Sequence, residues 1–122
     1  MAKIRPDELD DRLDAGTAPF VLDIRPKDHY RRGAIEGSYN APVYEDVRSG
    51  DESSLRRHLD DIPRERDVVV VCKMGIVAKR ATSILQSEGY DATTLAGGMS
   101  GWNGYQNGSL TYKIRSLLWR FF

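Results

Sequence analysis

A single cysteine, Cys72, directly follows four consecutive valines, Val68–Val71. A β-branched run without polar alternation is typical of a central parallel strand that is buried on both faces. Gly75 comes three residues later, and a helical pattern of apolar residues starts at Ala78. We therefore expect Cys72 at the carboxyl end of a central strand, where it opens a tight loop that leads into a helix. Ligands bind at this place in open α/β sheets.

A loop of this kind favours a reactive thiol. The main-chain N–H groups of a short connection from strand to helix form a concave site for anions, and the helix dipole strengthens it. A cysteine in such a site is stabilised as the thiolate, which is the nucleophilic form. The alternative is that Cys72 is a small buried residue that ends a strand, since free cysteines are often buried. Its position alone leaves both interpretations open.

Length and composition exclude several classes of protein. A chain of 122 residues forms one domain, and its 18 basic and 18 acidic residues give no reason to expect a nucleic-acid partner. No apolar run approaches the roughly 20 residues that span a bilayer, and the first residues, MAKIRPDELDD, lack the apolar core of a signal peptide. One cysteine cannot form an internal disulfide, and no Cys/His cluster predicts a metal or other cofactor. These features favour a protein that is located in the reducing cytoplasm.

Strand and helix patterns alternate along the chain. Strands are predicted at 20–24, around Tyr39, at Val68–Val71 and at 91–95, with a short one at Ile4. Helices are predicted at 7–13, Lys27–Arg32, 53–60 and 78–89, with a short one that reaches Trp102, and 43–50 is predicted to be a connector rich in turns. This alternation indicates a parallel sheet that is covered on both sides.

Three further polar side chains could lie near the cysteine. Asp23 and Arg25 flank Ile24, so on an extended strand both point to the same side. They form either a structural ion pair or a brace for the loop around Cys72, and both interpretations can hold together. His29 follows on the next helix, and a Cys/His pair of the thiol-protease kind is the less favoured reading because no orienting group accompanies it. His58 is expected to be solvated.

Three segments taken together resemble the rhodanese-like family, the persulfide-forming sulfurtransferases. Residues 21–42, VLDIRPKDHYRRGAIEGSYNAP, are similar to its N-terminal signature, with Asp-x-Arg, Gly-x-Ile-x-Gly and Asn-x-Pro. Residues 72–77, CKMGIV, resemble its six-residue active-site loop, and 95–102, LAGGMSGW, resemble its closing Gly-Gly-x-x-x-Trp. One such segment alone is weak evidence for the family, whereas all three in this order are specific for it.

The resemblance implies an α/β domain over residues 1–104, with a three-layer rhodanese-like fold and a central five-stranded parallel sheet flanked by helices. Cys72 would accept a sulfane sulfur as a persulfide and pass it to a thiophilic acceptor. Asp23 and Arg25 would support the neighbouring strand end. The main-chain N–H groups of the rest of the loop would bind the outer sulfur, and these belong to Lys73, Met74, Gly75, Ile76 and Val77.

The donor is left open between thiosulfate, another small anion and a protein persulfide. The alternative function is a sulfur-carrier or protein-interaction module with little turnover of small donors. The related dual-specificity phosphatases use a longer loop that ends in arginine, which argues against phosphate chemistry here. The loop holds one cation, Lys73, because Met74 and Val77 stand where some members have polar or charged residues. With Lys79 and Arg80 expected on an exposed helix face, only weak use of thiosulfate is predicted.

The tail forms a separate segment of linker and amphipathic helix, 105–122. The linker is expected at 105–109, and the helix that follows carries one apolar stripe with Trp119 on its opposite side. We expect the stripe to dock on the domain itself. The second alternative is that the stripe contacts a protein partner or a second copy of the chain, and contact with a membrane interface is least favoured. The stripe consists of Leu110, Ile114, Leu117, Leu118 and Phe121.

Overall fold

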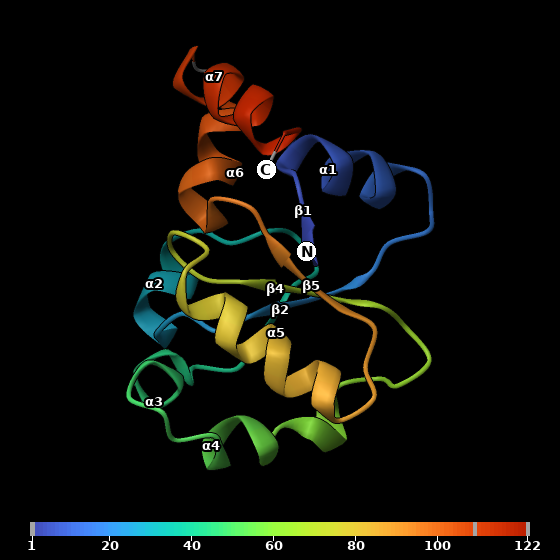
Figure 1. Cartoon of the computed structure of the whole chain (residues 1–122), viewed down its shortest axis with the longest axis vertical. Helices are drawn as coiled ribbons and strands as arrows, with labels where there is room; N and C mark the ends of the chain where they lie inside the picture. The colour runs from blue at the N-terminus through green and yellow to red at the C-terminus, as the bar shows by residue number, and fades with distance from the viewer. Residues whose placement is uncertain (1, 109, 122) are drawn as a thin grey trace.

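A parallel sheet of five strands runs through the centre of the molecule (Figure 1). The computed structural model describes residues 2–108 and 110–121, without the side chains of residues 110–113. The spatial order is β1-β5-β4-β2-β3, which confirms the predicted fold class. The strands are β1 (Lys3–Ile4), β2 (Phe20–Asp23), β3 (Tyr39–Asn40), β4 (Val68–Val71) and β5 (Ala92–Leu95).

Helices cover both faces of this sheet. One face carries α1 (Pro6–Asp14) and α6 (Gly98–Gln106), and the other carries α3 (Tyr44–Arg48), α4 (Ser53–Arg56) and α5 (Val77–Ser87). A 3₁₀ turn at Leu59–Asp61 follows α4, α2 (Lys27–Arg32) lies near the carboxyl ends of the strands, and α7 (Leu110–Trp119) contacts α6. No helix in the described ranges is long and apolar enough to cross a bilayer.

The four valines of β4 divide the core into two halves. Val68 and Val70 pack in the cluster beneath α3, α4 and α5, whereas Val69 and Val71 pack in the cluster beneath α1 and α6. All four are fully buried, as the uninterrupted apolar run predicts. Because side chains alternate along a strand, Cys72 continues the first series and belongs to the α5 side of the sheet.

Two predicted segments between β3 and β4 differ from the structure. The segment 43–50 was expected to be a turn-rich connector, but it contains the helix α3, which Val47 anchors in the core with 2% of its surface exposed. A helix of one turn with a single buried residue shows no periodic pattern in the sequence. The predicted helix at 53–60 is broken into α4 and the 3₁₀ turn.

The start of the predicted linker is helical instead. The linker was predicted from residue 105, but α6 continues to Gln106. The hydroxyl of Tyr105 donates a hydrogen bond of 2.5 Å to Asp10 Oδ2 and so ties the end of α6 to α1. Of the predicted linker, Asn107 and Gly108 lie between the helices, and Ser109 lies outside the described residues.

The helix α7 docks on the domain through a different face from the one predicted. The described stripe residues Ile114, Leu117, Leu118 and Phe121 are 51–75% exposed, and the side chain of Leu110 lies outside the described part. Ser116 is buried instead, and Trp119 is half-buried. The expectation that the stripe covers the domain is therefore wrong for these four residues.

Glycines of α6 explain this orientation. A Cβ on Gly97 would lie 2.9 Å from the Trp119 ring, and one on Gly101 would lie 3.3 Å from it. The indole thus rests directly on the main chain of α6, while the Arg115 guanidinium lies 5.2 Å from the centre of the indole ring. A flat ring can approach bare backbone more closely than the branched side chains of the stripe can.

We predict that Trp119→Ala lowers the free energy of unfolding by about 1–2 kcal/mol, because the ring is half-buried; a fully buried Trp costs roughly 3–5 kcal/mol. The matched variant Leu117→Ala, on the outward face, is expected to cost less than about 0.5 kcal/mol. Urea unfolding followed by far-ultraviolet circular dichroism measures both. A larger cost at Leu117 would show that the outward face, and not the indole, packs on the domain.

Candidate active site

The sulfur of Cys72 lies at the end of β4, inside the turn that starts α5. Its Sγ atom accepts hydrogen bonds from the main-chain N–H groups of Gly75 at 3.1 Å and Ala78 at 3.4 Å. Only 1% of the residue is exposed, and it packs with the core on the α5 side. Cys72 thus ends a buried strand, and its sulfur also receives amides near a helix N-terminus, while the reactivity of the thiol stays a prediction.

Gly75 allows the loop to turn this tightly. Its φ of +86° lies in the left-handed region, which side chains other than glycine adopt at a cost. A Cβ at this position would also lie 3.1 Å from the main-chain nitrogen of Gly97 and 3.2 Å from the carbonyl oxygen of Leu95. The loop therefore presses against the connection between β5 and α6, and glycine is needed for both reasons.

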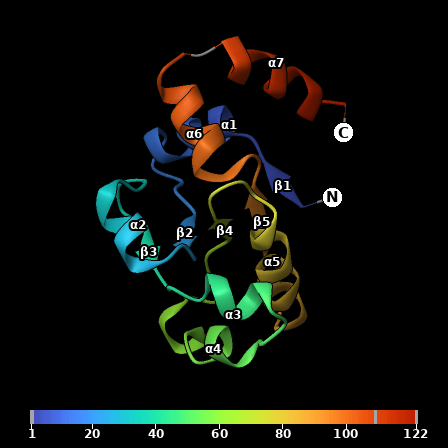
Figure 2. The same cartoon turned by 90° about the vertical axis from the view of Figure 1, so that its left-hand side faces the viewer.

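The first turn of α6 holds the loop from the other side. The N–H of Met99 donates to the Cys72 carbonyl at 2.8 Å, and the N–H of Ser100 donates to the Lys73 carbonyl at 3.0 Å. Gly98 has a φ of +56°, and a Cβ there would overlap the Cys72 carbonyl oxygen. In Figure 2 the connection between β4 and α5 runs between α6 above and α3 below.

The side chains of the loop point to different environments. Lys73 is exposed, Met74 is 47% exposed and Ile76 is 72% exposed, so the rim carries two large apolar groups. Gly75 and Val77 are buried and shape the inside of the turn. The predicted site residues of the loop thus come together around the sulfur, with one cation and two apolar groups on the outside.

A cavity of about 320 Å³ opens at the cysteine. Among the described residues that line it, none is acidic. The basic residues are Lys73 and two arginines, Arg48 from α3 and Arg80 from α5, and Arg80 Nη1 donates a hydrogen bond of 2.9 Å to the Arg48 carbonyl. The full lining is Tyr44, Arg48, Cys72, Lys73, Met74, Ile76, Val77 and Arg80.

Arg48 and Arg80 correct the expectation of a rim that is poor in cations, and Tyr44 lies beside them. Arg80 is exposed on a helix face, as expected, and Tyr44 and Arg48 belong to the segment that was expected to be a connector, yet all three line the cavity of Cys72. The spacing of Tyr44 and Arg48, four residues apart, would place them on one face of a helical turn, and this is the signal that could have revealed them. Their approach to the loop depends on tertiary packing, which a single sequence does not display.

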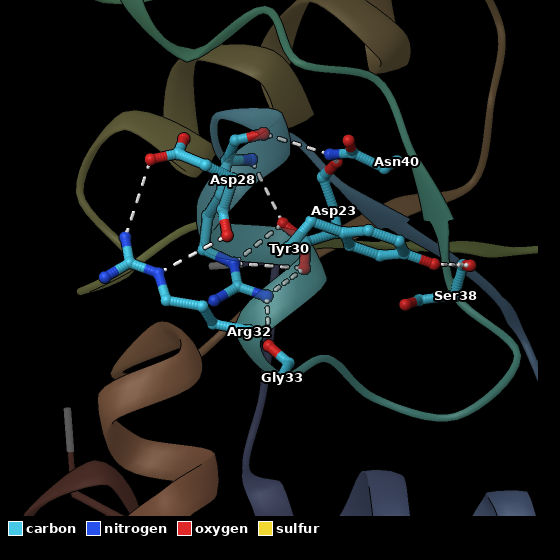
Figure 3. A network of polar contacts seen from close by, with 8 residues as sticks. Asp23, Asp28, Tyr30, Arg32, Gly33, Ser38 and Asn40 are labelled. Atoms are coloured by element: carbon cyan, nitrogen blue, oxygen red, sulfur yellow. Dashed lines mark hydrogen bonds and ion pairs between the residues drawn. The ribbon is translucent and has the colours of Figure 1, made fainter.

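Asp23 and Arg25 form a buried ion pair at the end of β2 (Figure 3). Arg25 Nη2 lies 2.7 Å from Asp23 Oδ2, and the main-chain N–H of Arg25 donates to Asp23 Oδ1 at 3.0 Å. The two residues are 1% and 7% exposed. The predicted ion pair on one side of the strand is therefore present.

This pair fastens the segments next to it. Arg25 Nη2 also donates to the Gly33 carbonyl at 2.8 Å, beyond the end of α2. Asn40 Nδ2 donates to the carbonyls of Asp23 at 3.0 Å and Arg25 at 2.9 Å, and Figure 3 shows Asp23 and Asn40 near one another. In the part of the chain that the structure describes, no hydrogen bond or ion pair joins either of these side chains to residues 72–77. Their support of the cysteine loop thus stays a prediction that would act through the strand end.

The two histidines are not partners of the cysteine. His29 lines a neighbouring hollow of about 680 Å³ together with Arg25 and Lys73, and it is absent from the lining of the Cys72 cavity. His58 is half-buried, with its Nδ1 atom 3.3 Å from the Tyr39 hydroxyl, so it is less solvated than predicted. The described residues contain no cluster of three or more His, Cys, Asp or Glu that could hold a metal ion.

The comparison with protein families decides the assignment. A model described as the Rhodanese-like domain matches residues 5–105. The chain belongs to this family. Among solved structures, a rhodanese-related protein from Thermoplasma volcanium has the same fold, with a TM-score of 0.71 at 24% identity over 89% of this chain and 95% of that one.

Relatives of this rhodanese-like chain include proteins named as sulfurtransferases. A putative mitochondrial thiosulfate sulfurtransferase from Schizosaccharomyces pombe is 34% identical over 67% of this chain and 61% of that protein. The adenylyltransferase and sulfurtransferase UBA4 from Eremothecium gossypii is 37% identical over 55% of this chain. The chain spans only 15–22% of the length of UBA4 and similar relatives, so it corresponds to a segment of those proteins.

We predict that Gly98→Ala displaces the cysteine loop of this rhodanese-like domain, because the added Cβ overlaps the Cys72 carbonyl. Gly37→Ala is the matched control, since Gly37 has a φ of +81° and no atom within 4 Å of the added Cβ. The control should cost about 1–2 kcal/mol of unfolding free energy, and Gly98→Ala about 1–3 kcal/mol more. Equal losses in chemical denaturation would contradict the close contact between α6 and the loop.

The buried ion pair yields a second stability prediction. Arg25→Met leaves the Asp23 carboxylate buried without its partner, and this change should cost about 3–5 kcal/mol. Arg32→Met removes an ion pair with Asp28 in which both side chains are more than 70% exposed, and it should cost less than about 1 kcal/mol. Thermal and denaturant unfolding measure both variants. Similar costs would show that Asp23 is not held by Arg25 as described.

Proposed function

We propose that this rhodanese-like chain is a sulfurtransferase in which Cys72 carries the transferred sulfur as a persulfide. One observation carries the proposal: the Cys72 sulfur accepts two main-chain N–H groups and opens into a cavity that is lined by three basic and no acidic described residues. Amides and cations together stabilise anionic sulfur, in the nucleophile and in the donor. Two relatives named as sulfurtransferases support the same chemistry.

The first step loads the cysteine. The Cys72 thiolate attacks the outer sulfur of a sulfane donor, and the bond between that sulfur and the rest of the donor breaks. With thiosulfate, sulfite leaves with the bonding electron pair and Cys72 becomes a persulfide anion, so charge and atoms balance. The Lys73 ammonium and the guanidinium groups of Arg48 and Arg80 would attract the donor and the departing anion.

The loop amides would hold the outer sulfur. Within the described residues, the main-chain N–H groups of four residues that follow the cysteine donate no hydrogen bond: Lys73, Met74, Ile76 and Val77. An anionic sulfur added to Sγ could accept such groups, in the manner of a nest of successive amides. Asp23 and Arg25 would keep the adjacent strand end in place during both steps.

The second step unloads the cysteine. A thiophilic acceptor such as a thiolate or cyanide attacks the outer sulfur, the S–S bond breaks, and the Cys72 thiolate is regenerated with the electron pair. No oxidant, metal or other cofactor takes part. The unpaired thiol also suits a reducing compartment, and we propose the cytoplasm.

The alternative is a carrier or interaction module that exchanges sulfur only with a protein. Two observations favour it. Met74 and Ile76 expose apolar surface beside the cysteine, and apolar side chains are also exposed on α7 and in the turn after it: Ile114, Leu117, Leu118 and Phe121. Exposed apolar patches mark contact surfaces in many proteins. A protein partner or a second copy of the chain at α7 thus stays a prediction, and so does the weaker expectation of a membrane interface.

We predict that the protein gains one sulfur atom per chain, seen as intact mass, after incubation with thiosulfate or with an organic persulfide. The chain has no other cysteine, so the added sulfur reports on Cys72 alone. Cys72→Ser should remain unmodified and fold as the wild type does, since the change is nearly isosteric. No added sulfur from either donor would refute the persulfide proposal.

Turnover separates the enzyme from the carrier. An enzyme releases many equivalents of thiocyanate per chain when donor and cyanide are both supplied, whereas a module that exchanges sulfur only with a protein releases almost none. We expect multiple turnovers, because Cys72 lines a cavity that also carries three basic residues.

A further inference from the structure

An exposed apolar face lies along α7 and the turn after it. Trp119 rests on α6 and Ser116 beside it is buried, so the opposite side of the helix turns outward. With 3.6 residues per turn, the outward side chains fall within an arc of about 100°. They are four of the six large apolar side chains that are exposed among the described residues, and we call them the outward face: Ile114, Leu117, Leu118 and Phe121.

The same segment is basic. The sequence holds no acidic residue after Asp91, and residues 110–122 include three basic ones, Lys113, Arg115 and Arg120. Residues 1–109 hold 15 basic and 18 acidic residues, so the positive charge of the tail stands against a net negative domain. A helix that combines an apolar face with cations and no acidic residue is typical of segments that lie on anionic lipid.

Two of the cations lie where an interfacial helix needs them. Helical spacing puts Arg115 on one flank of the outward face and Arg120 on the other. Arg120 is exposed, and Arg115 is half-buried with its guanidinium 5.2 Å from the centre of the Trp119 ring. Flanking arginines can keep their stems beside an apolar surface while their charged ends reach lipid phosphates.

Other occupants fit this face less well. A second copy of the chain would set the same basic flanks against each other, and four partly exposed side chains fall short of the about 800 Å² that each partner buries in a stable interface. The walls of a protein groove rise along both flanks of a bound helix, and here α6 already occupies the side of Trp119. A lipid surface is flat and needs the outward face alone.

We propose that α7 holds this domain on an anionic lipid surface. The helix would lie parallel to the surface, with its outward face at the boundary of the acyl chains and Arg120 at the level of the phosphates. The sequence alone ranks a protein partner above a membrane, and the orientation and charge of α7 reverse that order. This inference goes beyond sulfur transfer and does not depend on it.

The cysteine would stay accessible from water in this arrangement. In Figures 1 and 2, α7 lies at one end of the molecule and α3 and α4 lie at the other. None of the described residues that line the cavity of Cys72 belongs to α7. Lipid contact and sulfur loading therefore use different parts of the surface and can be measured separately.

The experiment measures the partition coefficient of the full chain by flotation with vesicles, made either of phosphatidylcholine alone or of phosphatidylcholine and phosphatidylglycerol in equal amounts. We expect binding to the mixed vesicles to be stronger by about tenfold or more at low ionic strength, and to weaken as salt is added. Leu118→Gln should lower the partition coefficient by about tenfold. Arg120→Gln should lower it by about fivefold on the mixed vesicles and hardly change it on neutral ones.

Two matched controls remove the same kinds of group elsewhere. Arg57→Gln takes one exposed cation from the end of α4, and Ile76→Gln takes one exposed apolar side chain from the cysteine loop. Both should bind the mixed vesicles as the wild type does. Circular dichroism verifies that each variant is folded, and Leu118→Gln should load sulfur from a persulfide donor at the wild-type rate.

Three outcomes would overturn the inference. The first is that the wild type fails to float with the mixed vesicles, and the second is that Arg57→Gln or Ile76→Gln lowers binding as much as the α7 variants do. The third is a dimer in analytical ultracentrifugation that persists with lipid present and is lost in Leu118→Gln, because a second copy would then cover the outward face. Each of these leaves the proposed sulfur transfer untouched, since loading of Cys72 is measured without lipid.

Discussion

The site depends on two hydrogen bonds between main-chain atoms, from the N–H groups of Met99 and Ser100 to the carbonyls of Cys72 and Lys73. They join the start of α6 to the cysteine loop, which is about 27 residues away in the chain. With the loop carbonyls turned toward α6, amides of the same loop face the sulfur from within. Gly98 permits the contact because any Cβ would overlap the Cys72 carbonyl. The closing Gly-Gly segment therefore helps to shape the cysteine loop.

The alternation of side chains along β4 decides which surroundings the sulfur receives. Cys72 follows Val70 by two residues, so its side chain points to the same face of the sheet as Val68 and Val70 do. That face carries α3 and α5, where Arg48 and Arg80 lie. A shift of one residue would turn it toward the layer of α1 and α6. The buried strand thus sets the chemistry of the loop as well as its position.

Local sequence patterns predicted β4, the place of Cys72 and the pairing of Asp23 with Arg25. The valine run determined β4 and the place of Cys72, and the spacing of Asp23 and Arg25 determined that they share one side of β2. Arg48 was missed because α3 is a single turn whose one fully buried side chain, Val47, leaves no periodic signal. Its approach to Cys72 depends on how α3 packs beside α5, and such packing joins residues that are far apart in sequence.

The orientation of α7 could not be predicted from the sequence either. Amphipathic spacing identifies an apolar stripe, but the hydrophobic effect has no direction of its own and needs a surface that fits. The turn at Gly97 and Gly98 offers bare backbone on both sides: Gly98 contacts the cysteine loop, and Gly97 contacts Arg115 and Trp119. A flat indole fits that surface better than Leu117 or Leu118 does, so the stripe faces outward. The tail and the cysteine loop consequently rest on two adjacent glycines: a side chain at Gly97 would disturb the packing of α7, and one at Gly98 would disturb the geometry around the sulfur.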